Sequence, residues 1–151
     1  MLFDTLMPRR REQHGLASAL IGEIVAAMEA VERSSAVQHL HPASTADDRL
    51  TLDFTDFALP RLAVYEANVG RLGLFNAPLP RELSYFYTRL NNLPQRLRAL
   101  RTPPNSSPDE QKLRARIAIG EIDQTMTLGN DLLRSMKGFV SRKRHDSISR
   151  A

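Results

Sequence analysis

Apolar residues recur at helical spacing in two long stretches, one near the start of the chain and one in its last third. Between about Arg10 and Ser34, the apolar positions repeat at alternating steps of three and four, which predicts an amphipathic helix. The same rhythm holds over eight positions later in the chain and predicts a second helix with a coiled-coil-like face. We call these eight positions the apolar seam: Ala115, Ile119, Ile122, Met126, Gly129, Leu133, Met136 and Val140.

The second of these helices has a clear start signal. Ser107 is a suitable N-cap, Pro108 fits the first helical position, and Glu110 completes a Ser-x-x-Glu capping box. Ala115 and Gly129 are small, so they allow another helix to approach closely. Glycine in a helix interior costs about 1 kcal/mol relative to alanine, and a close crossing at Gly129 would explain it.

Two further helices are predicted in the middle of the chain. A short one begins near Pro60 and ends near Val69, with Gly70 as a left-handed C-terminal cap. A longer one runs from about Pro80 to Leu100. Its apolar positions again alternate in steps of three and four, namely Leu83, Phe86, Leu90, Leu93, Leu97 and Leu100. Pro94 lies inside it and predicts a kink, or a restart capped by Asn92.

Residues 35 to 58 break the helical period. Pro42 and the following short polar residues indicate a loop, after which Leu50, Leu52 and Phe54 alternate with polar residues. A single strand would have no partner in this sequence. We therefore expect an irregular connection with an extended part packed on helices.

Together these elements predict an all-α protein: an antiparallel bundle of three long helices and one short helix. Residues 1–140 would form one helical domain and residues 141–151 a basic, flexible tail. The apolar seam is longer than one bundle needs, and its surplus predicts a two-fold homodimer.

Composition excludes several kinds of chemistry. The chain has 151 residues, 42% apolar and 25% charged, and contains no cysteine, so disulfides and thiolate chemistry are ruled out. No nucleophile elbow or phosphate-binding glycine loop is present. We therefore predict that the chain is not an enzyme and carries no cofactor.

Metal binding is also disfavoured by the sequence. His39 and His41, with Asp47 and Asp48 nearby, are the best candidate ligands, but their spacing fixes no third ligand. Carboxylates of the two long helices, such as Glu23 and Glu121, are expected on solvated helix faces. We predict no metal site.

The net charge of +4 is unevenly distributed. Residues 134–151 carry six basic residues and one acidic residue, and residues 61–101 carry seven arginines and two glutamates. Such concentrations favour binding to anions, either nucleic acid or an anionic membrane surface. The candidate anion-binding residues are Arg71, Lys137, Arg142, Lys143 and Arg144.

No transmembrane span or secretory signal is predicted. The best apolar run, Leu16 to Met28, has thirteen residues and includes Glu23, whereas a spanning helix needs about 20. This predicts a cytoplasmic protein, with a position at the inner face of a membrane left open.

The segment around residues 60–90 resembles a loosely defined set of uncharacterised bacterial proteins. The resemblance rests on Pro60-Arg61 with Tyr65-Glu66-Ala67-Asn68, the Gly70–Leu74 turn, Pro78-x-Pro80 and Tyr85-Phe86-Tyr87. It covers about residues 9–100 and implies no activity. In that set a membrane anchor precedes the basic cluster, whereas only eight residues precede Arg9 here. Either this version is soluble, or the chain begins just after an anchor, with Arg9 to Arg11 on the cytoplasmic side.

We therefore expect a homodimeric helical module for protein interaction or regulation. The second hypothesis is a nucleic-acid-binding accessory protein that uses the arginine-rich faces and the basic tail. The third is a small-ligand-binding helical protein with a pocket beneath residues 35–58.

Overall fold

The computed structural model describes the backbone of residues 2–41 and 51–148, and the side chains of residues 8–41 and 51–141. Every regular element in this part of the chain is a helix, so the protein is all-α. The elements are α1 (Leu2–Arg33), α2 (Ser35–Gln38), α4 (Ala63–Asn68), the 3₁₀ helix η1 (Val69–Leu74), α5 (Leu79–Ala99) and α6 (Pro108–Ile148).

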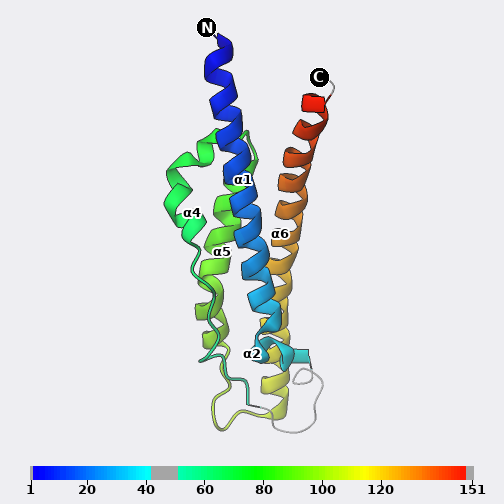
Figure 1. Cartoon of the computed structure of the whole chain (residues 1–151). Coiled ribbons are helices and arrows are strands. Elements are labelled where there is room, and N and C mark those ends of the chain that lie inside the picture. The colour runs from blue at the N-terminus through cyan, green and yellow to red at the C-terminus, as the bar shows by residue number, and fades with distance from the viewer. Residues whose placement is uncertain (1, 42–50, 149–151) are drawn as a thin grey trace.

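The three long helices lie side by side, but they are not antiparallel throughout. Figure 1 shows α1 and α5 running in the same direction and α6 running back against both. This direction arises because residues 51–62 and α4 carry the chain back along the bundle before α5 begins. Both chain ends consequently lie at the same end of the bundle.

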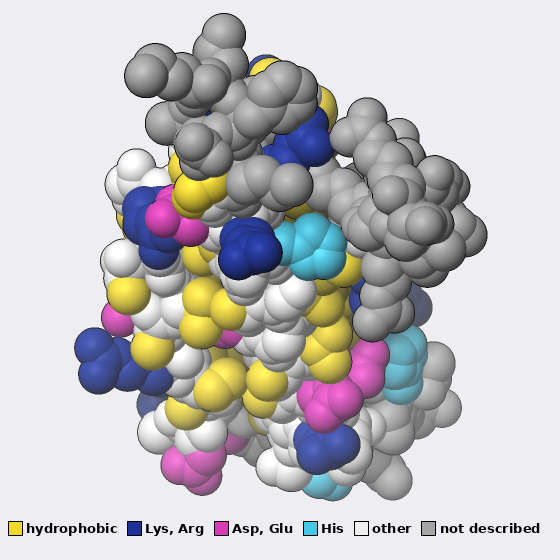
Figure 2. Space-filling model, turned by 45° about the horizontal axis from the view of Figure 1, so that its top comes forward, with side chains coloured by type: hydrophobic (Ala, Val, Ile, Leu, Met, Phe, Trp, Pro, Cys, Tyr) yellow, Lys and Arg dark blue, Asp and Glu magenta, His cyan; other side chains and the backbone are white. Residues whose placement is uncertain are grey.

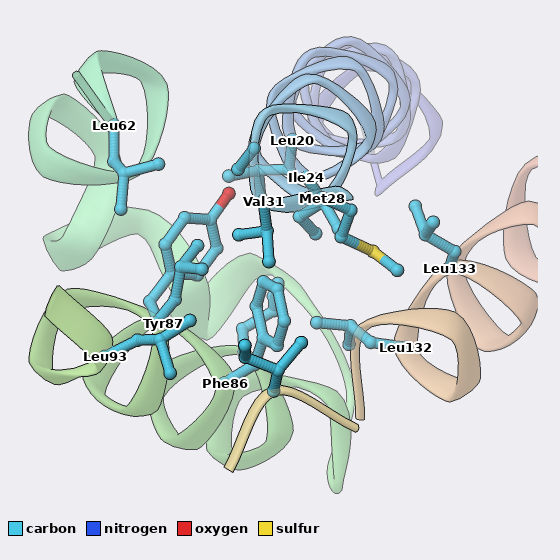
Figure 3. Packing of buried hydrophobic residues seen from close by; sticks show 14 of the residues in the cluster. Leu20, Ile24, Met28, Val31, Leu62, Phe86, Tyr87, Leu93, Leu132 and Leu133 are labelled. Carbon is cyan, nitrogen blue, oxygen red and sulfur yellow. The ribbon is translucent and has the colours of Figure 1, made fainter. Parts of the chain in front are cut away.

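The core forms where α1, α5 and α6 meet. Figure 3 shows side chains of α1, such as Ile24 and Val31, pointing toward Phe86 and Tyr87 of α5 and Leu132 of α6. These side chains are almost completely buried. Burial of an apolar side chain contributes about 1.5–3 kcal/mol, so this shared core accounts for most of what holds the helices together.

The apolar seam faces this core. Ala115, Ile122, Leu133 and Met136 are buried, and Ile119, Met126 and Val140 are partly buried against the same cluster. The seam is therefore used within one chain, by contacts with α1 and α5. The bundle therefore leaves no uncovered part of the apolar seam of the kind from which we predicted a homodimer. The homodimer stays a prediction, without support from the seam.

The first turn of α6 forms half of the predicted capping box. The Glu110 backbone N–H donates to Ser107 Oγ at 3.2 Å, as an N-cap requires. The Glu110 carboxylate instead accepts from the Arg114 guanidinium, at 2.9 Å from Nη2. An i, i+4 ion pair thus takes the place of the return hydrogen bond.

Two predicted helix boundaries were wrong. Helix α1 begins at Leu2 rather than near Arg10, with Pro8 inside it. Gly70 does not adopt a left-handed conformation, because the chain continues from α4 directly into η1. The 3₁₀ turn tightens the end of α4 and makes a left-handed cap unnecessary.

Pro94 does not restart the helix. Helix α5 is continuous from Leu79 to Ala99, and Asn92 lies in its interior rather than at a cap. Leu90, Leu93 and Leu97 are buried before and after the proline. Their burial keeps both halves in register and offsets the cost of about 3 kcal/mol for an internal proline.

The described part of the connection between α1 and α4 includes a short helix that the sequence did not predict, α2. Residues 51–62 have neither helix nor strand, and Leu52, Phe54 and Phe57 are buried in the core. The Leu52 N–H donates to Thr102 Oγ1 at 3.2 Å, and the Thr102 N–H donates to the Leu52 carbonyl at 3.3 Å. Asp47, Asp48 and Leu50 lie outside the described residues.

The domain boundary predicted at residue 140 coincides with no break in α6, whose backbone continues to Ile148. The division into a domain and a tail stays a prediction.

The segment Pro8–Arg33 of α1 is long and apolar enough, by length and composition alone, to cross a membrane. We predicted no such span from the thirteen-residue run between Leu16 and Met28, but a longer stretch of 18 residues reaches the required hydropathy with no more than two charged residues. Core helices meet the same criterion, and Leu20 and Ile24 of this segment are fully buried in the bundle.

Candidate anion-binding end of the bundle

Two hydrogen bonds join the first part of α1 to distant parts of the chain at one level of the bundle. The side-chain amide of Gln13 donates to the Leu74 carbonyl, at the end of η1. His14 Nε2 donates to the Val140 carbonyl of α6 at 3.2 Å. Past this level, α1 continues toward the N-terminus and α6 toward the C-terminus (Figure 1). Residues more than 120 positions apart in the sequence are thus brought to one end.

Basic residues from both ends of the chain gather at this end. Arg9, Arg10 and Arg11 are exposed and make no ion pair within the part of the chain that the structure describes. Figure 2 shows this side of the molecule, with basic side chains at several places and apolar side chains between them. We define the basic end as Arg9, Arg10, Arg11, Arg71, Lys137 and the α6 positions of Arg142, Lys143 and Arg144.

Of the predicted anion-binding residues whose side chains are described, Arg71 already has partners. Its Nη2 lies 3.6 Å from Glu12 Oε2, and its Nη1 donates to Asn68 Oδ1 at 3.0 Å. Both charged side chains are about half exposed, and an exposed pair of this kind contributes at most about 1 kcal/mol. A stronger anion could therefore displace Glu12.

The other predicted anion-binding residues all lie on α6. Lys137 is exposed one turn before Ser141. Arg142, Lys143 and Arg144 follow on the helical backbone, and their side chains lie outside the described part.

At the opposite end of the bundle, three arginines form ion pairs with carboxylates. Arg33 pairs with Glu29 at 3.2 Å, and Arg114 pairs with Glu110 at 2.9 Å. Arg96 donates to Glu121 at 2.9 Å. Arg33, Arg96 and Arg114 are therefore compensated within the chain, whereas the described part of the structure gives Arg9–Arg11 no such pair.

A groove lies beside the basic end, between α1 and the α4–η1 segment. It has a volume of about 340 Å³ and is lined by Glu12, Gly15, Leu16, Ala19, Asn68 and Arg71. Its polar groups already bond to one another, so it offers no uncompensated charge to a ligand. It is also not the pocket beneath residues 35–58 that the third hypothesis requires.

The carboxylate of Glu23 accepts three hydrogen bonds where α1 meets α4 and α5. It accepts hydrogen bonds from the backbone N–H groups of Val64 at 2.6 Å and Tyr65 at 2.9 Å, and from the Tyr87 hydroxyl at 3.0 Å. The prediction that Glu23 lies on a solvated face was wrong. Its role is to hold the start of α4 against α1, because short helices need partners for their first N–H groups.

The Tyr87 hydroxyl stays protonated in this cluster. Burial raises the pKa of Tyr87 well above its usual value, and the neighbouring Glu23 carboxylate raises it further. The Tyr65 and Tyr87 rings stack with centroids 3.9 Å apart. A phenol that remains neutral and donates to Glu23 is a structural group, and it is a poor general base at neutral pH.

A second polar cluster joins α5 to α6. Arg89 donates from Nη2 to Glu121 Oε2 at 3.2 Å and from Nε to Thr125 Oγ1 at 3.2 Å. Arg96 shares the same Glu121 oxygen. Glu121 is thus engaged between two arginines, which assigns it to helix packing.

Of the four candidate metal ligands, the structure describes His39 and His41. His39 Nδ1 lies 2.7 Å from the Ser35 carbonyl, and Asp47 and Asp48 lie outside the described residues. Among the described residues, no three His, Asp or Glu side chains are placed to hold one metal ion.

Comparisons with protein-family models, curated proteins and solved structures give no match for this chain. The resemblance that the sequence shows over residues 9–100 therefore stays a prediction, and the function must be argued from this chain alone.

Proposed function

We propose that this protein is a non-enzymatic helical module that docks on an anionic surface through its basic end. The observation that supports this proposal is the convergence of two basic stretches, Arg9–Arg11 and residues 142–144, which the sequence separates by more than 130 residues. The bundle of three long helices would hold both stretches on one rigid support.

The charge balance at this end favours association with an anion. The basic end has eight basic residues, and the acidic residues within five sequence positions of Arg9–Arg11 and of residues 142–144 are Asp4, Glu12 and Asp146. Each basic residue near an anionic surface contributes about 1 kcal/mol at physiological salt, so several acting together give useful affinity. The attraction extends over about 8 Å, the screening length under these conditions.

Elution from a heparin column tests this proposal, because heparin is a generic polyanion. We expect the triple variant Arg9→Gln, Arg10→Gln, Arg11→Gln to elute at much lower salt than the unchanged protein. The matched control removes the same charge at the opposite end, with Arg33→Gln, Arg101→Gln and Arg116→Gln. Equal elution of the two triple variants would refute the proposal, because net charge alone would then explain binding.

A protein partner is a second candidate, supported by a different observation. Leu113 and Ile117 are 56% and 45% exposed, four residues apart on α6, and together form an apolar pair on its outer face. We propose that this pair contributes to the predicted homodimer or to another protein contact. Light scattering tests this by measuring the molar mass of the unchanged protein and of Leu113→Gln/Ile117→Gln. Equal molar masses for the two proteins would argue against a homodimer at this pair.

A further inference from the structure

We propose that the anionic surface is a lipid bilayer, and that the first two turns of α1 insert apolar side chains into it beside the basic end. This inference rests on the proposed function and specifies its partner. It follows from the register of α1 and from its position at the end of the bundle.

Helix α1 extends well beyond the contacts that hold it in the bundle. Among the described side chains, Glu12, Gln13 and His14 are those nearest the start of α1 that bond to other elements, and the helix begins at Leu2. At 1.5 Å per residue, this leaves about 15 Å of helix beyond that level. Figure 1 shows this part projecting away from α4 and α5.

The projecting part of α1 has an amphipathic register. Leu2, Phe3, Leu6 and Met7 occupy positions two, three, six and seven, which share one side of an α-helix. Asp4, Thr5 and Pro8 occupy the opposite side. The next turn is basic, with Arg9, Arg10 and Arg11. A helix with one apolar side and adjacent basic residues lies in the interface of an anionic bilayer.

This combination favours a bilayer over a nucleic acid. Lysine and arginine contact lipid phosphates and nucleic-acid phosphates alike, so charge alone does not distinguish them. Phosphate contacts on a nucleic acid would leave Phe3 and Met7 in water. A bilayer receives these residues below the headgroups while Arg9–Arg11 remain at the level of the phosphates.

Tryptophan fluorescence gives a direct test, because the natural chain contains no tryptophan. With vesicles of phosphatidylglycerol and phosphatidylcholine in equal parts, we expect Phe3→Trp to shift its emission to the blue. Tyr85→Trp is the control, since Tyr85 is 57% exposed on α5 and not on the projecting part of α1. No shift at position 3 under conditions where the protein sediments with the vesicles would overturn the insertion.

Matched double substitutions measure the apolar contribution separately. We expect Phe3→Gln/Met7→Gln to weaken vesicle binding by about tenfold or more, because two apolar side chains lose their burial. Leu113→Gln/Ile117→Gln changes a pair with the same spacing on α6 and should leave vesicle binding unchanged. Equal weakening by both pairs would refute the assigned orientation.

Three outcomes separate the proposals. Binding to heparin and duplex DNA but not to the vesicles would overturn the bilayer inference and leave the proposed function intact. Binding to none of them would overturn both. Vesicle-bound protein that high salt does not release would also contradict the inference, because it would indicate a transmembrane α1 rather than peripheral docking.

Discussion

Gly129 provides the sharpest test of the packing, because the structure places it where all three long helices meet. A Cβ atom added at Gly129 would lie 2.6 Å from Met28 Sδ of α1 and 2.9 Å from Phe86 Cε2 of α5. Both distances are shorter than real Cβ contacts, so at least one neighbour must move. The end of Met28 is flexible, whereas the Phe86 ring is only 1% exposed and is surrounded by the core.

Two opposing effects determine how much Gly129→Ala changes the free energy of unfolding. Alanine improves helix propensity by about 1 kcal/mol relative to glycine. Overpacking of a well-packed core costs about 1–3 kcal/mol. We therefore expect the free energy of unfolding to fall by about 1 kcal/mol, which for a chain of this size lowers the Tm by about 2–4 °C.

Gly120 is the matched control, since it also lies inside α6 but has nothing within 4 Å of an added Cβ. Gly120→Ala should therefore raise the free energy of unfolding by up to about 1 kcal/mol. Chemical denaturation of both variants, followed by circular dichroism, measures the difference. If Gly129→Ala stabilises the protein as much as Gly120→Ala does, the close approach of α1, α5 and α6 at this point is wrong.

A double-mutant cycle identifies the neighbour responsible. Met28→Ala alone should cost about 2–5 kcal/mol through the cavity that it leaves. In the Gly129→Ala background the same change should cost about 1 kcal/mol less, because the new methyl group occupies part of that cavity. Strict additivity would show that Met28 does not limit the space at Gly129.

Three further predictions concern the interior and the corner after α4. Glu23→Gln should lower the free energy of unfolding by about 1–3 kcal/mol, because the glutamine amide cannot accept hydrogen bonds from both Val64 and Tyr87 as the carboxylate does. The control Glu29→Gln, at an exposed position, should change the free energy of unfolding by less than about 0.5 kcal/mol. Chemical denaturation measures both. The raised pKa of Tyr87 means that, above about pH 10, the unfolded chain ionises this phenol while the folded chain does not. Stability should therefore fall with rising pH more steeply in the unchanged protein than in Tyr87→Phe, and equal slopes would contradict the assignment. Gly70→Ala should leave stability unchanged or raise it by about 0.5 kcal/mol, since no left-handed backbone is needed there, and a marked loss in thermal unfolding would restore the predicted cap.

Sequence periodicity was a reliable guide to the long helices and to the side that each one buries. Positions predicted from the steps of three and four are buried in the core, as Leu20, Ile24, Leu83, Leu90 and Met136 show. These positions are predictable because burial acts on a whole helix face and repeats with the helical turn. Local signals were less dependable, as Gly70 and Pro94 show, because packing on either side of a residue overrides its own preference.

The candidate site was only partly predictable. The basic residues are visible in the sequence, but Arg9–Arg11 were considered only as part of a family resemblance and were not among the predicted anion-binding residues. No local pattern links them to residues 142–144. Glu23 was missed as a structural residue because its partners, Val64, Tyr65 and Tyr87, are 41 to 64 positions away.

The sequence by itself determined that the chain is all-α, where its long helices lie and which residues they bury, because each of these depends on spacing within one helix. Only the tertiary structure decided that α1 and α5 run in the same direction, that the apolar seam is used within one chain, and that both basic stretches reach one end. These features depend on how residues 51–62 and α4 return along the bundle and on where distant helices touch. Such long-range contacts leave no periodic signal in the sequence.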